Sequence, residues 1–146
     1  MKKQLNYIKL EFPALSANES FARTAAAAFA AQLDPTIEEL GDIRTAVSEA
    51  VTNAIVHAYP DEAGPVSMRL RILEGNVLEL TVRDRGRGIE DVARAMEPMY
   101  STGGDDRSGM GFTIMESFTD GLRVRSAPGR GTTVTMTKRV RSKALS

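Results

Sequence analysis

The sequence predicts an α+β sandwich that forms one domain over residues 1–146. The predicted elements follow the order strand, helix, helix, strand, strand, helix, loop, helix, strand, strand. Strands and helices therefore do not alternate one for one, as they would in a parallel doubly wound sheet. With 146 residues, of which 42% are hydrophobic, the chain is long enough to bury a core of its own.

The first two predicted elements are a strand and a helix. Apolar and polar residues alternate over residues 7–12, which predicts a half-buried strand that ends at Pro13. Ser16 followed by Glu19 matches the capping box of a helix N-terminus. Apolar residues then recur at helical spacing, so we expect a helix over residues 17–32.

A second, longer helix is predicted next. Thr36 and Glu39 form another capping box, directly after Pro35. Apolar residues then continue at spacings of three and four until Pro60 interrupts them. This pattern predicts an amphipathic helix over residues 37–58.

The middle of the chain predicts a hairpin and a short helix. Residues 66–73 and 77–83 are expected to be strands. Gly75 and Asn76 stand between them and suit a tight hairpin turn. A short helix is expected over residues 89–96.

The last third begins with a segment that has no periodicity. Residues 97–108 include two adjacent glycines and predict a mobile loop, and loops of this length are usually functional or disordered. Ser108 can cap a helix that extends to Phe118. Two further strands are expected over residues 121–126 and 132–140.

Composition excludes several classes of protein. The chain has no cysteine and a single histidine, His57, so it cannot form a disulfide framework, a thiolate metal site or a multi-histidine zinc site. No apolar run approaches the roughly 20 residues that span a bilayer. No apolar segment follows the basic start of the chain, so we see no signal peptide and expect a cytoplasmic protein.

The net charge is zero, but the charges are unevenly distributed along the chain. Residues 11–62 hold nine acids and two bases, whereas residues 121–146 hold seven bases and no acid. Two solvated faces explain this asymmetry, and so does a bipolar surface that orients a partner. Aromatic residues make up 5% and tryptophan is absent, so nothing indicates a direct nucleic-acid contact.

Three polar residues share one face of the long predicted helix. Glu49, Asn53 and His57 follow one another at intervals of four residues. Taken alone, Glu49 and Asn53 are typical of a hydrogen-bonded surface pair. The residues around most of this helix are apolar, however, so a carboxylate on it faces either solvent or a pocket.

An acid and two glycines follow the strand that is predicted to end near residue 83. Asp84, Gly86 and Gly88 suit a strand-to-helix turn that needs two flexible residues. They equally suit a pocket wall, where the acid binds a ligand and the glycines let a flat ligand approach the backbone.

Glycines also occur at the predicted start of the helix that ends at Phe118. Gly109 and Gly111 each lower helix stability by roughly 1 kcal/mol relative to alanine. Backbone amides at a glycine-rich helix N-terminus form an anion site, and Arg107 adds a cation suited to phosphate. A plain helix cap explains the same residues, and no Walker-type sequence follows.

The order of these motifs is more specific than any one of them. The set comprises Glu49-x-x-x-Asn53, Asp84-x-Gly86-x-Gly88, Gly109-x-Gly111 and Gly131-Thr132. It resembles the ATPase domain shared by gyrase, Hsp90, histidine kinases and MutL. Segments 19–23, 48–57 and 107–116 further resemble the sporulation anti-sigma serine kinases of endospore-forming bacteria. The resemblance covers nearly the whole chain. It implies a two-layer sandwich of the Bergerat type, with a mixed, mostly antiparallel sheet and helices on one face.

The resemblance implies a site for ATP or ADP with Mg²⁺. Asp84 would accept a hydrogen bond from the adenine amino group, and Thr132 would support that contact. Gly86 and Gly88 would let the base lie close to the backbone. Asn53 would hold the Mg²⁺ that bridges the phosphates.

The resemblance also implies the residues around the phosphates. Glu49 would act as general base, taking or orienting the proton of a serine hydroxyl for in-line attack on the γ-phosphate. His57 would line the pocket, and residues 97–108 would form a lid. The remaining nucleotide-binding residues implied are Thr102, Arg107, Ser108, Gly109, Met110 and Gly111. The lid departs from the family pattern, because two glycines and two acids follow Thr102, where a lysine and a proline are common.

Such kinases resemble one another in having two protein partners. The resemblance implies a homodimer that holds a sporulation sigma factor of the sigma F type inactive and phosphorylates a small anti-anti-sigma protein on serine. Glu19 and Arg23 match the family's partner contacts. Three alternatives stay open: a stress-response anti-sigma kinase of the sigma B type, a binding module that nucleotide only shapes, and a stand-alone ATPase.

Overall fold

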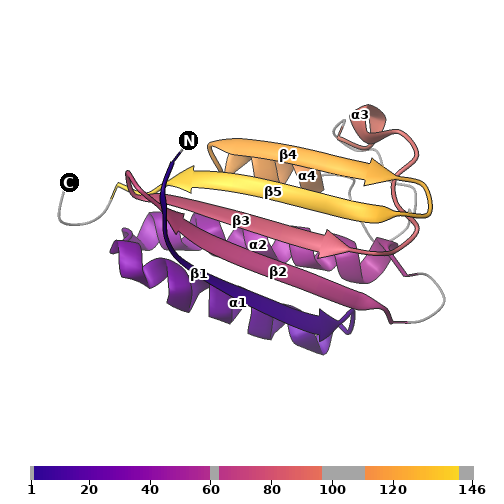
Figure 1. Ribbon diagram of the computed structural model, residues 1–146, viewed down its shortest axis with the longest axis horizontal. Helices are drawn as coiled ribbons and strands as arrows, with labels where there is room; N and C mark the ends of the chain where they lie inside the picture. The colour runs from indigo at the N-terminus through magenta and orange to yellow at the C-terminus, as the bar shows by residue number, and fades with distance from the viewer. Residues whose placement is uncertain (1, 60–62, 97–110, 142–146) are drawn as a thin grey trace.

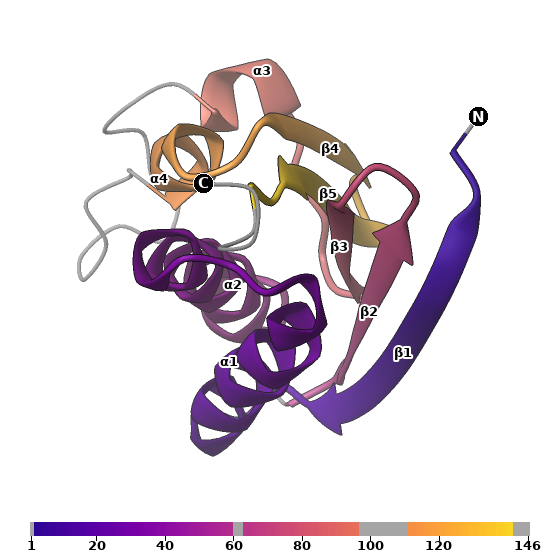
Figure 2. The same cartoon turned by 90° about the vertical axis from the view of Figure 1, so that its left-hand side faces the viewer.

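The computed structural model describes residues 2–59, 63–96 and 111–141, which form a sheet covered by helices on one face (Figures 1 and 2). The strands are β1 (Gln4–Pro13), β2 (Pro65–Leu73), β3 (Val77–Asp84), β4 (Gly121–Ala127) and β5 (Gly131–Arg139). They follow the order β1-β2-β3-β5-β4, and all four neighbouring pairs are antiparallel. The predicted α+β sandwich with a mostly antiparallel sheet is therefore confirmed.

Three helices form the second layer. The helical elements are α1 (Ala17–Ala30), η1 (Ala31–Leu33), α2 (Ile37–His57), α3 (Val92–Ala95) and α4 (Gly111–Ser117). Figure 2 shows α1, α2 and α4 on the same side of the sheet, while α3 lies near the edge formed by β4. The opposite face of the sheet is not covered by any described element (Figure 1).

The core lies between α2 and the central strands. Val47, Ala50 and Val51 are at most 1% exposed on the inner side of α2. They face the inner side of the sheet, where Met68 and Leu70 of β2 are fully buried. Burying a side chain of this size contributes about 1.5–3 kcal/mol, so the apolar stripe of α2 holds this helix against the sheet.

The two predicted capping boxes have different outcomes. At the start of α2, the Glu39 N–H donates to Thr36 Oγ1 (3.1 Å) and the Thr36 N–H donates to Glu39 Oε1 (3.0 Å), which confirms that box. At the start of α1, Ser16 has helical backbone angles and its side chain makes no capping bond, so the first box is wrong. Glu19 instead pairs with Arg23, one turn further along α1 (3.6 Å).

Most predicted boundaries shift by one to three residues. The first helix ends earlier and closes with the turn of η1, and the helix expected over residues 89–96 is reduced to the four residues of α3. The hairpin turn is confirmed, since Gly75 (φ +85°) and Asn76 (φ +61°) both adopt positive φ. The predicted loop over residues 97–108 lies outside the described residues.

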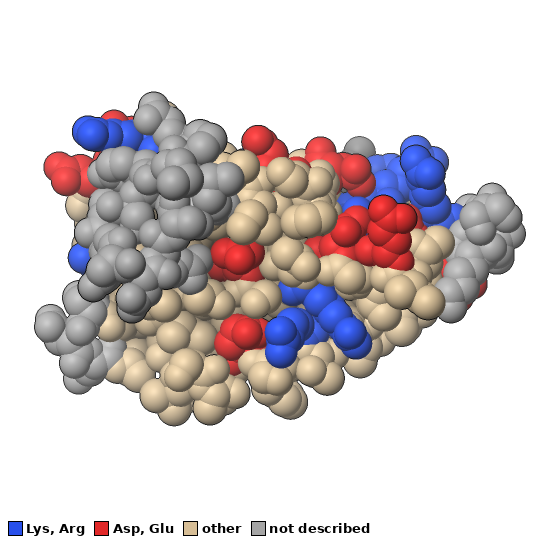
Figure 3. All heavy atoms as spheres, turned by 180° about the vertical axis from the view of Figure 1, so that it is seen from behind, with Lys and Arg blue, Asp and Glu red and all other residues tan. Residues whose placement is uncertain are grey.

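Acidic and basic side chains occur on both faces of the molecule. On the open face of the sheet, Arg71 and Glu79 form an ion pair of 2.8 Å, and Arg123 and Arg125 of β4 are exposed. Figure 3 shows acidic and basic side chains side by side on the helix-covered face, so that face carries no uniform charge. Among the described residues, no helix is long and apolar enough to cross a membrane.

Candidate functional site

A cavity of about 820 Å³ opens between the C-terminal half of α2 and the ends of β3 and β5. Residues of α3, the start of α4 and the turn after β4 complete the described part of its wall. The cavity brings together six of the predicted site residues, Asn53, His57, Asp84, Gly88, Gly111 and Thr132. These residues come from four separate segments of the chain, namely α2, the end of β3 with the loop after it, the start of α4, and β5, and the fold brings them to one cavity.

The polar face of α2 supplies one wall of the cavity. Asn53 and His57 both line it and are half-buried. Glu49 lies one turn earlier on the same face and is also half-buried, but it is not among the residues that line the cavity. Because the opposite side of α2 packs into the core, this face is held toward the cavity by burial of the apolar stripe.

Asp84 is the most deeply buried polar group of the wall, with 6% of the residue exposed. Strand pairing places it opposite Thr132 of β5. Its Oδ1 accepts hydrogen bonds from the Gly86 N–H (2.9 Å) and the Thr132 N–H (3.2 Å). Burial raises the pKa of Asp84, and these two N–H groups offset part of that rise. Both bonds end on Oδ1, which leaves Oδ2 as the oxygen for a ligand donor.

The glycines after Asp84 pack against backbone rather than open space. A Cβ on Gly86 would lie 2.1 Å from the carbonyl oxygen of Ala58, and one on Gly88 would lie 2.0 Å from that of Ala127. Gly88 also has a positive φ of +76°. The packing alone therefore requires glycine at both positions, whether or not a base also lies against them.

Two residues that the sequence analysis did not single out hold this loop in place. The Tyr59 hydroxyl donates to the Pro65 carbonyl (2.6 Å) and accepts from the Arg85 N–H (2.8 Å). Ser126 Oγ accepts from the Ile89 N–H (2.7 Å). No signal in the sequence identifies either residue. Tyr59 lies 26 positions from Arg85 and Ser126 lies 37 positions from Ile89, so each pair meets only in the folded chain.

Part of the predicted site lies outside the described residues. This part comprises Thr102, Arg107, Ser108, Gly109 and Met110. Gly111 is described, begins α4 and lines the cavity.

The predicted partner contacts lie elsewhere, on α1. Glu19 and Arg23 are not among the residues that line the cavity, and their side chains are 23% and 41% exposed. They form a partly solvated ion pair within one helix, of the kind that contributes little to stability.

The described residues provide few ligands for a metal ion. Within them, no group of three or more histidines, cysteines, aspartates or glutamates could hold one. The amide oxygen of Asn53 in the cavity wall is a suitable hard ligand for Mg²⁺, which commonly keeps several waters and takes further oxygens from substrate phosphates. A bound nucleotide would therefore have to supply part of the coordination.

Comparison with known families defines the class of this protein. Residues 12–138 match the model of the histidine kinase-like ATPase domain, a family that binds ATP. In the solved structures, the RsbU and RsbW domains of a Mycobacterium tuberculosis protein share the fold, with a TM-score of 0.69 at 18% identity. That match covers 93% of this chain and 33% of the other.

More similar sequences narrow the class to one family. An anti-sigma F factor from Caldanaerobacter subterraneus is 57% identical over 91% of this chain and 93% of its own length. Another from a Thermoanaerobacter species is 53% identical over 94% of this chain and 96% of its own length. The chain therefore belongs to the anti-sigma F factors, within the histidine kinase-like ATPase family.

Proposed function

We propose that this chain is a serine kinase that uses ATP and Mg²⁺ and that also binds and inhibits a sigma factor of the sigma F type. The observation that carries the proposal is the buried carboxylate of Asp84 in the wall of a cavity that Asn53 and His57 also line. The membership of the chain in the anti-sigma F factors supports the same conclusion and favours sigma F over the stress-response alternative. We take residues 1–146 as one domain that carries both activities.

The base of ATP binds at the β3–β5 end of the cavity. An adenine amino group donates a hydrogen bond to the free oxygen of Asp84, and Thr132 stands beside it in the register of the sheet. A buried acceptor of this kind recognises a donor strongly, because an unmatched polar group in the cavity costs free energy.

The phosphates lie toward the start of α4. Asn53 would hold Mg²⁺, which when bound would supply positive charge against the phosphates. The backbone amides of residues 109–111 would donate to the phosphates, and Arg107 would pair with the terminal one. Ser108 and Thr102, which lie outside the described residues, would complete this part of the site.

Glu49 is the general base of the transfer. It lies one turn before Asn53 on the same face of α2, so a serine hydroxyl held near it would also lie near the terminal phosphate. Glu49 accepts or orients the hydroxyl proton while the serine oxygen attacks phosphorus and the ADP oxygen leaves. The substrate is an anti-anti-sigma protein, and Glu19 and Arg23 of a homodimer contact the partners.

Transfer of label from ATP tests this function. The purified chain is incubated with γ-³²P-labelled ATP, Mg²⁺ and the candidate anti-anti-sigma protein, and label on a partner serine is followed. We expect transfer by the wild type and loss of at least 10²-fold with Glu49→Ala, the scale of a lost general base. Glu38→Ala, an exposed acid in the first turn of the same helix, is the matched control and should keep the activity.

Sigma-factor binding is measured in parallel with the same variants. Glu49→Ala should still bind the sigma factor, which separates loss of chemistry from loss of fold. Nucleotide-dependent sigma binding without any transfer would favour the pure binding module. Steady ATP turnover without a protein substrate would favour a stand-alone ATPase. Either result would refute the kinase assignment.

A further inference from the structure

We propose that Ser126 is a positioning residue that fixes the direction of the Thr132 hydroxyl and so helps the cavity select adenine over guanine. This inference rests on the proposed function, because it concerns the nucleotide that the cavity binds. Ser126 itself is not among the residues that line the cavity, whereas Thr132 is. Ser126 therefore acts through Thr132.

Ser126 makes an unusually complete set of contacts for one hydroxyl. It lies on the inner face of β4, directly opposite Thr132 in the β4–β5 register. Its Oγ is 2.7 Å from the Ile89 nitrogen, 2.9 Å from the Gly131 carbonyl oxygen and 2.7 Å from Thr132 Oγ1. Thus three segments of the chain meet at this oxygen: the loop after β3, the start of β5 and β4 itself.

The chemistry of the three partners determines which atom donates in each contact. A serine hydroxyl has one hydrogen and two lone pairs. The Ile89 N–H can only donate to Ser126, and the carbonyl oxygen of Gly131 can only accept from it. The single hydrogen of Ser126 is therefore used on Gly131, and the second lone pair is left for Thr132.

The contact between the two hydroxyls then has one direction. The 2.7 Å contact between the two hydroxyl oxygens is compatible with either donor, and we infer from the other two partners of Ser126 that Thr132 donates. In the reverse arrangement Ser126 would donate to Thr132, and its oxygen would face the Gly131 oxygen at 2.9 Å with no hydrogen between them. That arrangement leaves two acceptors in contact, which is unfavourable in a partly buried site.

The direction of this hydrogen bond determines whether the Thr132 hydroxyl presents a donor or an acceptor to the cavity. With its hydrogen directed at Ser126, Thr132 Oγ1 presents only lone pairs to a ligand, and Asp84 beside it already acts as an acceptor toward the Gly86 and Thr132 N–H groups. Adenine carries an amino group on the six-membered ring where guanine carries a carbonyl oxygen. Two acceptors fit the amino group, directly or through a water, whereas a carbonyl oxygen finds no donor there.

Isothermal titration calorimetry of ADP and GDP with the chain of residues 1–146 tests the inference. We expect the wild type to prefer ADP. In Ser126→Ala the Thr132 hydroxyl is free to turn and donate, so the ADP-over-GDP affinity ratio should fall about tenfold, the effect of one redirected hydrogen bond. Ser126→Thr retains the hydroxyl and should keep the ratio. Thr133→Val, on the opposite face of β5, is the control and should leave both affinities unchanged.

The ADP-over-GDP affinity ratio separates a positioning role of Ser126 from a purely structural one. Loss of the Ile89 contact alone would loosen the loop and weaken ADP and GDP equally, so an unchanged ratio in Ser126→Ala would overturn the inference while leaving ATP binding intact. The effect must also pass through Thr132. If Ser126→Ala lowered the ratio by the same factor in a Thr132→Val background, the inference would be wrong.

Two further outcomes are informative. A wild type that bound neither nucleotide would overturn the proposed function, and this inference with it. If the alanine variant did not fold, Ser126→Cys would replace it, because a thiol keeps the approximate volume but is a weak donor and acceptor. It should lower the ratio in the same direction, and an unchanged ratio would again count against the inference.

Discussion

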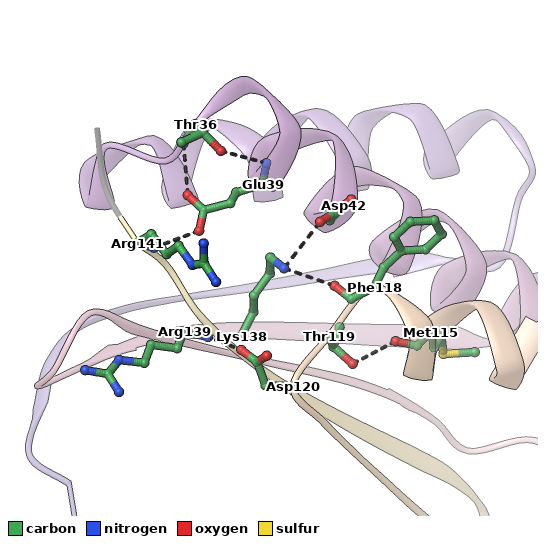
Figure 4. Close-up of polar contacts among 10 residues, drawn as sticks. All are labelled: Thr36, Glu39, Asp42, Met115, Phe118, Thr119, Asp120, Lys138, Arg139 and Arg141. Atoms are coloured by element: carbon green, nitrogen blue, oxygen red, sulfur yellow. Dashed lines mark hydrogen bonds and ion pairs between the residues drawn. The ribbon is translucent and has the colours of Figure 1, made fainter. Parts of the chain in front are cut away.

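Replacing Glu39 with glutamine perturbs a buried carboxylate that joins the start of α2 to the end of β5 (Figure 4). Its Oε1 accepts from the Thr36 N–H (3.0 Å), and its Oε2 accepts from the Arg141 N–H (2.7 Å). Lys138 reaches across the same gap, with its Nζ 3.4 Å from Asp42 and 3.3 Å from the Phe118 carbonyl. Glutamine has almost the same shape as glutamate, so the change tests the hydrogen bonds rather than the packing.

The expected loss follows from counting acceptors. An amide has one oxygen for two N–H donors in different parts of the chain, so either Thr36 or Arg141 loses its partner. Leaving one buried donor unpaired costs about 1–3 kcal/mol, and the bond that remains loses its charge assistance, about a further 1 kcal/mol. We therefore expect Glu39→Gln to lose about 2–4 kcal/mol of unfolding free energy, or about 5–15 °C in Tm for a chain of this size.

Urea unfolding at pH 7 measures this loss, with Glu38→Gln as the matched control. Glu38 occupies the same first turn but is exposed, so its neutralisation should cost only about 0.3–1 kcal/mol through the helix dipole. A Glu39→Gln variant no less stable than the control would refute the reasoning. It would mean that the Thr36 and Arg141 N–H groups find other partners.

The pH dependence gives an independent check of the same carboxylate. Burial of Glu39 disfavours its charge, but the N–H groups of Thr36 and Arg141, the Thr36 hydroxyl and the charge of Lys138 outweigh it and lower the pKa below the usual 4.5. A lowered pKa stabilises the folded state above the unfolded-state value, and that stability is lost as the pH falls through the folded-state value. The gap between wild type and Glu39→Gln should therefore shrink as the pH falls below about 4.5.

Three further substitutions test the nucleotide end of the molecule. Asp84→Asn should abolish ADP binding in calorimetry, yet its unfolding free energy in urea at pH 7 should be at least that of the wild type. The difference in unfolding free energy between variant and wild type should disappear as the pH falls toward 3.8, because burial raises the pKa of Asp84 and penalises only its ionised form. Gly88→Ala should lower the unfolding free energy measured in urea by more than about 2 kcal/mol, because its Cβ would meet the Ala127 carbonyl. Gly129→Ala is the control, with the same φ of +76° but open space around its Cβ, and should lower the unfolding free energy by about 1 kcal/mol. Tyr59→Phe should lower the unfolding free energy by about 1–3 kcal/mol and weaken ADP binding. The Arg85 N–H in the loop after β3 and the Pro65 carbonyl at the start of β2 both lose their hydrogen-bond partner.

The sequence could predict the elements whose signals are local. The capping box of Thr36 and the spacing of apolar residues in α2 depend only on residues within that helix. The Ser16 box failed because the chain already turns before it. The Leu15 N–H bonds to the Pro13 carbonyl and the Asn18 N–H to the Leu15 carbonyl, so Ser16 adopts helical angles and its side chain is not placed to cap.

The residues that line the cavity are predictable from the sequence where a motif carries its own chemistry. Asp84 was singled out as an acid directly after a strand, and Asn53 by its spacing on α2. Tyr59 and Ser126 could not be found in this way, because each acts on a backbone N–H that is brought near only by folding. The glycines show a related limit: the sequence revealed that flexible residues were needed, but not that Gly86 faces the Ala58 carbonyl.

Among the described residues, two charged side chains are buried, and their environments differ in a way that separates scaffold from site. Glu39 receives donors on both oxygens, and its pKa is lowered in spite of burial, so its charge stabilises the fold. Asp84 receives donors on one oxygen only, and its pKa is raised by burial. Its second oxygen is not among the buried side-chain atoms that lack a partner, so it is open to the cavity that Asp84 lines. A deeply buried carboxylate with one oxygen available to a ligand donor is typical of a binding site, which is why we place the base of ATP at Asp84.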